Sequence, residues 1–288
     1  MSDPASDTTS FALGLIGSGI GASLTPAMQE REGREAGLSL TYRLIDLDVH
    51  GMTRADLPEV LAWLRRLGFD GVNITHPFKQ AVVPLLDELS DDARDLGAVN
   101  TIVFRDGLML GRNTDWSGYG RAFREVLPDA VHDRALLIGA GGAGVAVGYG
   151  LLRQGASRVD VLDADVDAAS ACVERLAARF GPGRVGVARD LNEALAGAQG
   201  VVNATPVGMH GHPGTAIPFD RLRSDLWVSD VVYFPLETEL VTAARNRGCR
   251  VLPGGGMAVQ QAVGAFEYFT GRPADSARME AHFKELTG

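Results

Sequence analysis

The sequence has few cysteines, no long apolar run and no excess of basic residues. Its two cysteines, Cys172 and Cys249, lack the Cys/His spacing of a metal site, so we expect reduced thiols and no bound metal. No apolar run approaches membrane-spanning length, and the N-terminus lacks the basic-then-apolar pattern of a signal peptide. The 27 basic and 36 acidic residues give a net charge of −9, which argues against a nucleic-acid partner. We therefore expect a cytoplasmic protein that binds neither membranes nor nucleic acid.

The residues that are present indicate a globular α/β protein with two domains. Hydrophobic residues make up 45% and charged residues 22% of a chain of 288 residues, which is long enough for two separate cores. In the C-terminal half, short apolar strands alternate with helical patterns, the βαβ rhythm of a parallel, doubly wound sheet. These strands are predicted near 135–138, 158–163, 185–188, 200–203, 227–232 and 250–252.

The N-terminal half has a less regular order of elements. Strands are predicted at 11–16, 40–47, 71–75, 98–104 and 108–110, with a hairpin turn at 105–107. Helices are predicted at 26–37 with Thr25 as N-cap, at 56–67, from Lys79 to Leu86, and at 116–127. Two further helices, 257–269 and 274–286, follow at the C-terminus. We place the domain boundary near Trp116.

A glycine-rich stretch near the middle of the chain predicts a dinucleotide site. Gly139, Gly141 and Gly144 stand at G-x-G-x-x-G spacing between a strand and a helix, where backbone N–H groups and the positive helix end would face a pyrophosphate. The next strand ends in Asp163, nineteen residues after Gly144, where a carboxylate would accept a hydrogen bond from a ribose 2′-hydroxyl. The alternative is a strand–helix turn without a ligand, but strand, turn, helix and acid all agree with the dinucleotide interpretation.

Four short polar stretches each end a predicted strand or begin a predicted helix. They are 23–25, 73–79, 99–101 and 113–115. Ligands of open α/β sheets bind outside the carboxyl ends of the strands, so these stretches could converge on one ligand rich in hydroxyl groups. Each has an ordinary alternative, because Ser and Thr cap helices and Asn forms turns. Taken alone, Lys79 would most often be a solvated lysine at a helix start, and Asp115 an N-cap.

The polar stretches and the glycine turn carry a resemblance to the shikimate dehydrogenase family. In the N-terminal half the matching motifs are Ser23-x-Thr25-Pro26, Asn73-x-Thr75-x-Pro77-x-Lys79, Gly97-Ala-Val-Asn-Thr101 and Gly111-x-Asn113-Thr-Asp115. In the C-terminal half they are Gly139-Ala-Gly-Gly-Ala-Gly144, Asn203-Ala-Thr-Pro-x-Gly-Met209, Asp230-x-x-Tyr233-x-Pro235-x-x-Thr238 and Met257-x-x-x-Gln261-Ala262. The similarity covers nearly the whole chain in order.

The resemblance implies a substrate-binding catalytic domain at 1–115, completed by the C-terminal helices 257–288, and a Rossmann-like NAD-binding domain at 116–256. It implies reversible oxidation of a ring hydroxyl of a polyhydroxy cyclohexene carboxylate to a ketone. Lys79 and Asp115 would form the catalytic pair, while Ser23, Thr25 and Tyr233 contact the substrate carboxylate and Thr75, Asn100 and Gln261 hold ring hydroxyls. The cofactor would contact Gly139, Ala140, Gly141, Gly142, Ala143, Gly144, Asp163, Asn203, Thr205, Pro206, Val232, Gly254 and Met257.

The chemistry agrees with these implied roles. Oxidation of a secondary alcohol needs a hydride acceptor, here the nicotinamide, and a base for the hydroxyl proton. Lys79 can be that base only if its pKa falls, and a nearby Asp115 would oppose this, so Asp115 is better cast as orienting Lys79 and the hydroxyl. His76 is a weaker candidate for the base, because its ring need not point inward.

Two departures from the common family pattern favour NAD and quinate. Thr25 replaces the second serine of a Ser-x-Ser motif, and Asp163, Asp165 and Asp167 follow the second nucleotide strand where an Asn-Arg-type pair would favour NADP. Both departures resemble the NAD-dependent quinate/shikimate dehydrogenase branch. We therefore predict an enzyme of this branch that acts on small-molecule substrates, quinate and shikimate, as a monomer or homodimer. The alternatives are an NADP-dependent shikimate dehydrogenase of aromatic biosynthesis, an aminoshikimate relative, or a ligand-sensing regulator without turnover. The regulator would be expected to have lost Lys79 or Asp115, and both are present.

Overall fold

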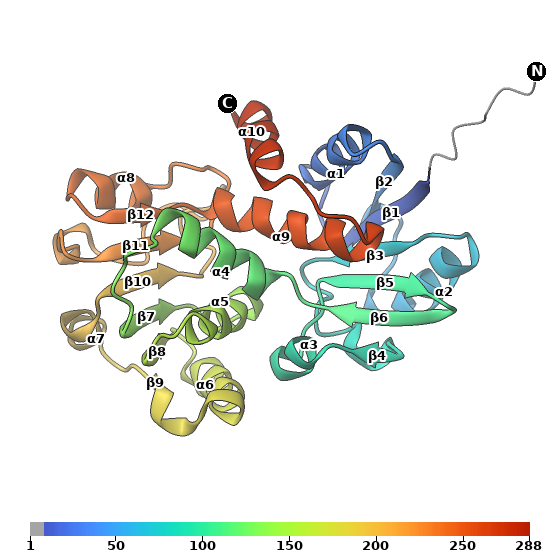
Figure 1. Cartoon of the computed structure of the whole chain (residues 1–288). Helices are drawn as coiled ribbons and strands as arrows, with labels where there is room; N and C mark the ends of the chain where they lie inside the picture. The colour runs from blue at the N-terminus through green and yellow to red at the C-terminus, as the bar shows by residue number, and fades with distance from the viewer. Residues whose placement is uncertain (1–8) are drawn as a thin grey trace, which may run out of the picture. The chain divides into compact units, whose positions relative to one another are not determined.

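The computed structural model describes residues 9–288, which form two compact units (Figure 1). The first unit contains the described residues up to Thr114 together with Ala262–Gly288, and the second unit contains Asp115–Gln261. Within the described residues, each unit is built around one six-stranded sheet. The helix α9 (Gly254–Thr270) contains the second of the two boundaries, so it contributes residues to both units.

The sheet of the first unit is mixed and has the strand order β2-β1-β3-β5-β6-β4. β1 pairs in parallel with both β2 and β3, whereas β5 runs antiparallel to β3 and to β6. The strands are β1 (Ser10–Gly17), β2 (Ser39–Asp46), β3 (Gly71–Ile74), β4 (Glu88–Leu89), β5 (Thr101–Arg105) and β6 (Leu108–Arg112). The turn between β5 and β6 has positive φ at both central residues, Asp106 (53°) and Gly107 (78°), as a type I′ hairpin turn requires.

The helices of the first unit include α1 (Thr25–Glu35), α2 (Leu57–Arg66), α3 (Asp91–Leu96) and α10 (Ser276–Thr287). The helix α2 buries one apolar face, formed by Leu57, Val60, Leu61 and Leu64, as its 3.6-residue periodicity predicts. The short β4 and α3 were not predicted.

Two local predictions for this unit are wrong. Leu24 occupies the N-cap position of α1, so Thr25 is the first helical residue and not the cap. No α-helix runs from Lys79 to Leu86. That segment forms turns and a short 3-10 helix at Val83–Leu85, because Pro84 lacks the N–H that a longer helix would need there.

The sheet of the second unit is entirely parallel, with the order β12-β11-β10-β7-β8-β9. Its strands are β7 (Arg134–Ile138), β8 (Arg158–Leu162), β9 (Val185–Val187), β10 (Gly200–Asn203), β11 (Trp227–Asp230) and β12 (Arg250–Leu252). The connecting helices are α4 (Asp115–Val126), α5 (Gly142–Arg153), α6 (Val166–Phe180), α7 (Leu191–Gly197) and α8 (Glu239–Asn246). Counted from β7, this is the Rossmann order 3-2-1-4-5-6 with its switch point between β7 and β10, which confirms the predicted α/β fold.

The interior of the second unit is apolar, as a sheet covered on both faces requires. Leu136, Val201 and Val228 from three neighbouring strands are fully buried and pack in one cluster with the residues of α7 and α8.

Both cysteines are buried and free, and burial raises the pKa of the Cys172 thiol to about 12. Among residues 9–288 no helix is long and apolar enough to span a membrane, and no cluster of His, Cys, Asp or Glu could hold a metal ion.

Candidate active site

The turn between β7 and α5 has glycine at the positions where the backbone leaves no room for a side chain. Gly139 has φ +102°, and a Cβ there would lie 2.8 Å from the carbonyl of Ala204. A Cβ on Gly144 would lie 2.0 Å from the carbonyl oxygen of Gly139. At Gly141 and Gly142, by contrast, a Cβ would meet no atom within 4 Å. The first and last glycines therefore serve close packing, and the middle pair leaves open space at the N-terminus of α5, where a ligand phosphate can approach.

The carboxylate of Asp163 lies directly beside this turn. It accepts a hydrogen bond from the N–H of Ala140 at 2.7 Å and another from the N–H of Asp165 at 2.9 Å. A carboxylate has about four acceptor positions, so Asp163 retains capacity for a ribose hydroxyl. Asp165 in turn caps α6, since its side chain accepts from the N–H groups of Asp167 and Ala168. The predicted pairing of glycine turn and acid is thus present in space.

The loops after β10 and β11 lie on the other side of the switch point. The Asn203 side chain accepts from the hydroxyl of Thr205 at 2.6 Å and from its N–H at 3.1 Å, which fixes the loop leading to Pro206. In the turn after β11, the carbonyl oxygen of Val232 would lie 2.4 Å from a Cβ on Gly254, at the start of α9. Asn203 and Thr205 therefore lie at the loop after β10, Val232 in the turn after β11, and Gly254 at the start of α9 after β12. All three segments follow the carboxyl ends of neighbouring strands.

In the first unit, the segment after β3 carries the predicted base. Lys79 is half-buried, and its carbonyl oxygen accepts from the N–H of Val99 at 2.9 Å. Thr75 is also half-buried, whereas His76 is exposed. Lys79 and Thr75 thus lie in one turn held against the segment that leads into Asn100.

Asn100 connects three of the four polar stretches within the first unit. Its side chain donates to the Thr114 hydroxyl at 2.9 Å and accepts from the Thr114 N–H at 2.8 Å. The Asn73 amide donates to the Asn100 carbonyl oxygen and to the Thr101 hydroxyl, both at 3.0 Å, and accepts from Tyr42. Asp115, the residue after Thr114, begins α4 and is 2% exposed. The two hydrogen bonds with Asn100 therefore fix Thr114, the residue immediately before the predicted catalytic carboxylate.

The fourth stretch presents two adjacent hydroxyls at the start of α1. Ser23 donates to the Thr25 hydroxyl at 3.2 Å and accepts from the Thr25 N–H at 3.3 Å. One turn later, the buried Gln29 donates to the carbonyl oxygen of Ala262 at 2.9 Å, which joins α1 to α9. The start of α1 is therefore held by a buried contact four residues away.

The predicted residues are divided between the two units. Ser23, Thr25, Thr75, Lys79 and Asn100 belong to the first unit, and Asp115, Tyr233, Gln261 and the predicted cofactor residues belong to the second. Tyr233 is 45% exposed, while Gln261 and Met257 are half-buried in α9. Sequence reasoning missed the side chains that hold these groups, such as Asn73, Thr114 and Asp230, although the matched motifs contain all three.

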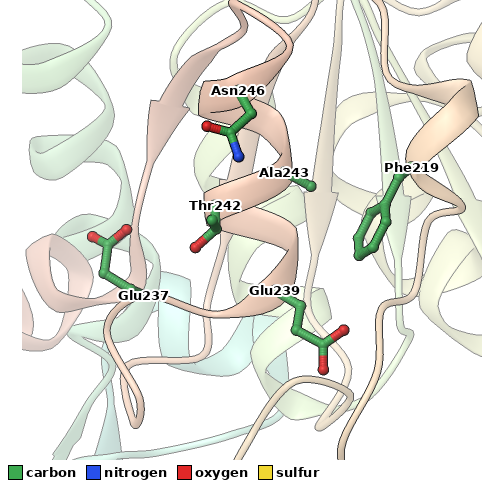
Figure 2. Close-up of a pocket in the computed structure, with 6 residues that line it drawn as sticks. All are labelled: Phe219, Glu237, Glu239, Thr242, Ala243 and Asn246. Carbon is green, nitrogen blue, oxygen red and sulfur yellow. The ribbon is translucent and has the colours of Figure 1, made fainter.

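A surface hollow on α8 is separate from these residues (Figure 2). It has a volume of about 400 Å³ and is lined by Phe219, Glu237, Glu239, Thr242, Ala243 and Asn246. The picture shows Thr242 and Ala243 on the helix, with the ring of Phe219 opposite Ala243. None of the predicted site residues lines this hollow, so it adds nothing to the proposed site.

A Rossmann-ordered sheet with a tight glycine turn and an acid at the end of the second strand defines a dinucleotide-binding protein. Comparison with known proteins narrows this class. Residues 15–102 match the model of the shikimate dehydrogenase substrate binding domain, and residues 254–282 match that of the shikimate 5'-dehydrogenase C-terminal domain.

Similar whole proteins point to the same family. The chain is 51% identical to a shikimate dehydrogenase (NADP(+)) of Pseudarthrobacter chlorophenolicus, over 97% of this chain and 96% of the relative. It is 49% identical to a quinate/shikimate dehydrogenase (NAD(+)) of Corynebacterium glutamicum, over 96% of this chain and 99% of the relative. A solved quinate dehydrogenase from Corynebacterium glutamicum in complex with NAD superposes with a TM-score of 0.91 at 48% identity, covering 96% of this chain and all of the other. The chain therefore belongs to the shikimate dehydrogenase family, a family of oxidoreductases that use a pyridine nucleotide, as the sequence predicts.

Proposed function

We propose that the protein is an NAD-dependent quinate/shikimate dehydrogenase. It would reversibly oxidise a ring hydroxyl, converting quinate to 3-dehydroquinate and shikimate to 3-dehydroshikimate. The observation that carries the choice of NAD is the Asp163 carboxylate, held against the glycine turn by the N–H of Ala140. A 2′-phosphate at this position would meet a like charge, and residues 164–167 include two further acids and no base.

The residues of the second unit fit this cofactor. The open space at Gly141 and Gly142 suits a pyrophosphate at the N-terminus of α5, and Asp163 suits an unmodified ribose. We assign the nicotinamide end to the loops that carry Asn203, Thr205, Pro206 and Val232 and to the first turn of α9, with Gly254 and Met257. Bound NAD supplies the hydride acceptor.

The residues of the chain supply the rest of the chemistry. Lys79 takes the hydroxyl proton as the hydride leaves, and Asp115 orients the lysine and the hydroxyl. We assign the substrate carboxylate to Ser23, Thr25 and Tyr233. We assign binding of the remaining ring hydroxyls to Thr75, Asn100 and Gln261. His76 is exposed and has no part in this assignment.

The same proposal covers organisation and setting. Residues 1–115 with 257–288 bind the substrate, and residues 116–256 bind NAD. Quinate and shikimate are small soluble acids, so we infer a cytoplasmic enzyme, monomeric or homodimeric, that works without a nucleic-acid or membrane partner.

A second candidate is an NADP-dependent shikimate dehydrogenase. It is favoured by the relatives of 51% identity, which are described as NADP(+) enzymes. Initial rates with quinate and shikimate, each crossed with NAD and NADP, separate the candidates. We expect turnover of both acids and a kcat/KM for NAD at least tenfold above that for NADP. A kcat/KM for NADP equal to or above that for NAD would establish the second candidate, and no turnover of either acid would refute both.

A further inference from the structure

A buried carboxylate lies at the end of β11 in the second unit. Asp230 is 1% exposed and accepts three hydrogen bonds. Its Oδ1 accepts from the Asn203 side-chain amide and from the N–H of Val232, each at 3.0 Å, and its Oδ2 accepts from the Thr238 hydroxyl at 2.7 Å. Burial raises the pKa of Asp230, and the three hydrogen bonds oppose that shift.

The three donors come from three different segments. Asn203 ends β10, Val232 lies in the turn after β11, and Thr238 is the N-cap of α8, where its hydroxyl also accepts from the N–H of Val241. Asn203 extends the network into its own loop, because its amide also donates to the Val207 carbonyl oxygen at 3.0 Å. One carboxylate thus fixes the loop after β10, the turn after β11 and the start of α8 relative to one another.

We propose that Asp230 is a positioning residue for the nicotinamide end of the cofactor. The inference rests on the proposed function, which assigns that end to Thr205, Pro206 and Val232. Asp230 contacts Val232 directly and reaches Thr205 through Asn203, whose side-chain oxygen accepts from the Thr205 hydroxyl. A buried carboxylate is a poor way to gain stability, because desolvation opposes it and apolar residues of similar size stabilise at least as well. Two oxygens at a fixed angle, however, can align three donors from three segments, which apolar packing cannot do.

Because of where Asp230 lies, its effect on the nicotinamide end can be measured apart from cofactor binding as a whole. The groups assigned to the adenosine and pyrophosphate lie at the ends of β7 and β8, whereas Asp230 acts at β10 and β11, the other side of the switch point. Loosening the Asp230 network should therefore misplace the nicotinamide ring while leaving the adenosine half in place. ADP-ribose lacks the nicotinamide, so its affinity reports on the adenosine half of the cofactor site alone.

Two substitutions loosen the network by different amounts. Asp230→Asn keeps the size and one acceptor oxygen. Its NH₂ must then face either the two N–H donors or the Thr238 hydroxyl, and in the second case the proton of that hydroxyl loses its acceptor. Thr238→Val removes one hydrogen bond and leaves the carboxylate, and Thr238→Ser restores the hydroxyl as the conservative variant. Asp160→Asn is the matched control, because Asp160 is a buried carboxylate of the same sheet that pairs with Arg134 and Arg158 instead.

The experiment measures ADP-ribose affinity by calorimetry and the hydride-transfer rate in a single turnover with NAD and the faster of the two acids. We expect Asp230→Asn and Thr238→Val to bind ADP-ribose within threefold of the parent protein, while hydride transfer slows tenfold or more. Thr238→Ser and Asp160→Asn should keep the rate within threefold, even if Asp160→Asn lowers the melting temperature.

Two results for the variants would overturn the role of Asp230. One is unchanged hydride transfer in Asp230→Asn, and the other is a parallel loss of ADP-ribose affinity and rate, which would mean a general loosening of the unit. A parent protein that neither binds ADP-ribose nor oxidises either acid would instead refute the proposed function, and the role of Asp230 with it.

Discussion

Exchanging two residues at the end of β8 should reverse the predicted cofactor preference. The double substitution Asp163→Asn with Ala164→Arg removes the carboxylate beside the glycine turn and adds a cation at an exposed neighbouring position. A 2′-phosphate carries a charge of about −1.5 to −2. At a separation of about 5 Å, each unit of that charge is repelled by a carboxylate with about 1 kcal/mol in a water-like dielectric and about 3 kcal/mol in a protein-like one.

Asp163 is only half-buried, so the lower part of this range applies. We therefore expect removal of the repulsion and gain of the arginine to change the NADP-to-NAD ratio of kcat/KM by about 2–3 kcal/mol, or about 30- to 150-fold. The NAD reaction should also weaken. Asparagine has a single acceptor oxygen, so either the Ala140 N–H or the Asp165 N–H loses its partner.

The assay is kcat/KM for both cofactors in the parent, the double variant and each single variant. Ala164→Arg alone is the matched control. We expect it to change the ratio only about five- to tenfold, because the new cation cancels the repulsion by the carboxylate but the carboxylate stays in place. A ratio within threefold of the parent in the double variant would show that cofactor choice does not depend on this strand end.

The remaining predictions test the assigned base, the substrate end, the glycine turn and one buried histidine. Lys79→Ala should lower kcat by about 10²–10⁴-fold with little change in KM, as steady-state kinetics will show; near-normal turnover would place the base elsewhere. Thr25→Ser should raise the shikimate-to-quinate ratio of kcat/KM by a few-fold to about tenfold, the effect of one hydrogen bond of about 0.5–1.5 kcal/mol, and an unchanged ratio would remove Thr25 from specificity. Gly144→Ala should lower the free energy of urea unfolding by about 1–3 kcal/mol and abolish ADP-ribose binding, because the added Cβ would lie 2.0 Å from the Gly139 carbonyl oxygen. Gly142→Ala is the control and should keep the stability of the parent, because its Cβ meets no atom within 4 Å. Equal stabilities of the two variants would contradict the steric reasoning. Burial and the charge of Arg31 lower the pKa of His282, so its stabilising effect is complete above pH 6.5 and is lost as the pH falls through the depressed pKa. The unfolding free energy of the parent should therefore fall more between pH 7.5 and 5.5 than that of His282→Gln, and parallel curves would contradict this.

The second unit was predictable from sequence almost strand by strand. Each of its six predicted strands lies within two residues of the observed one, as for 135–138 against Arg134–Ile138 and 227–232 against Trp227–Asp230. A parallel sheet covered on both faces needs continuous apolar strands, and these stand out in any window of the sequence. The glycine turn and Asp163 were predictable for a similar reason, since their spacing follows from the length of one strand–helix–strand unit.

The first unit shows where local patterns stop being informative. The segment after Lys79 has helix-forming residues, but Pro84 and the backbone contact of Lys79 with Val99 decide its actual path. Thr25 is a typical N-cap residue, yet here the Ser23 hydroxyl accepts a hydrogen bond from the Thr25 N–H. The strand β4 has two residues, Glu88 and Leu89, too few for any periodicity to appear.

The side chains that hold the site together are invisible to spacing for a further reason. Asn203 and Asp230 are 27 residues apart and meet only because β10 and β11 are neighbours in register, with Asn203 opposite Asp230. Each of these residue types is, by itself, an ordinary turn or cap residue. Motifs therefore predict the groups that would touch cofactor and substrate, because those groups act where one local turn faces a ligand. Groups that align two turns depend on strand order and register, and these are known only once the sheet is assembled.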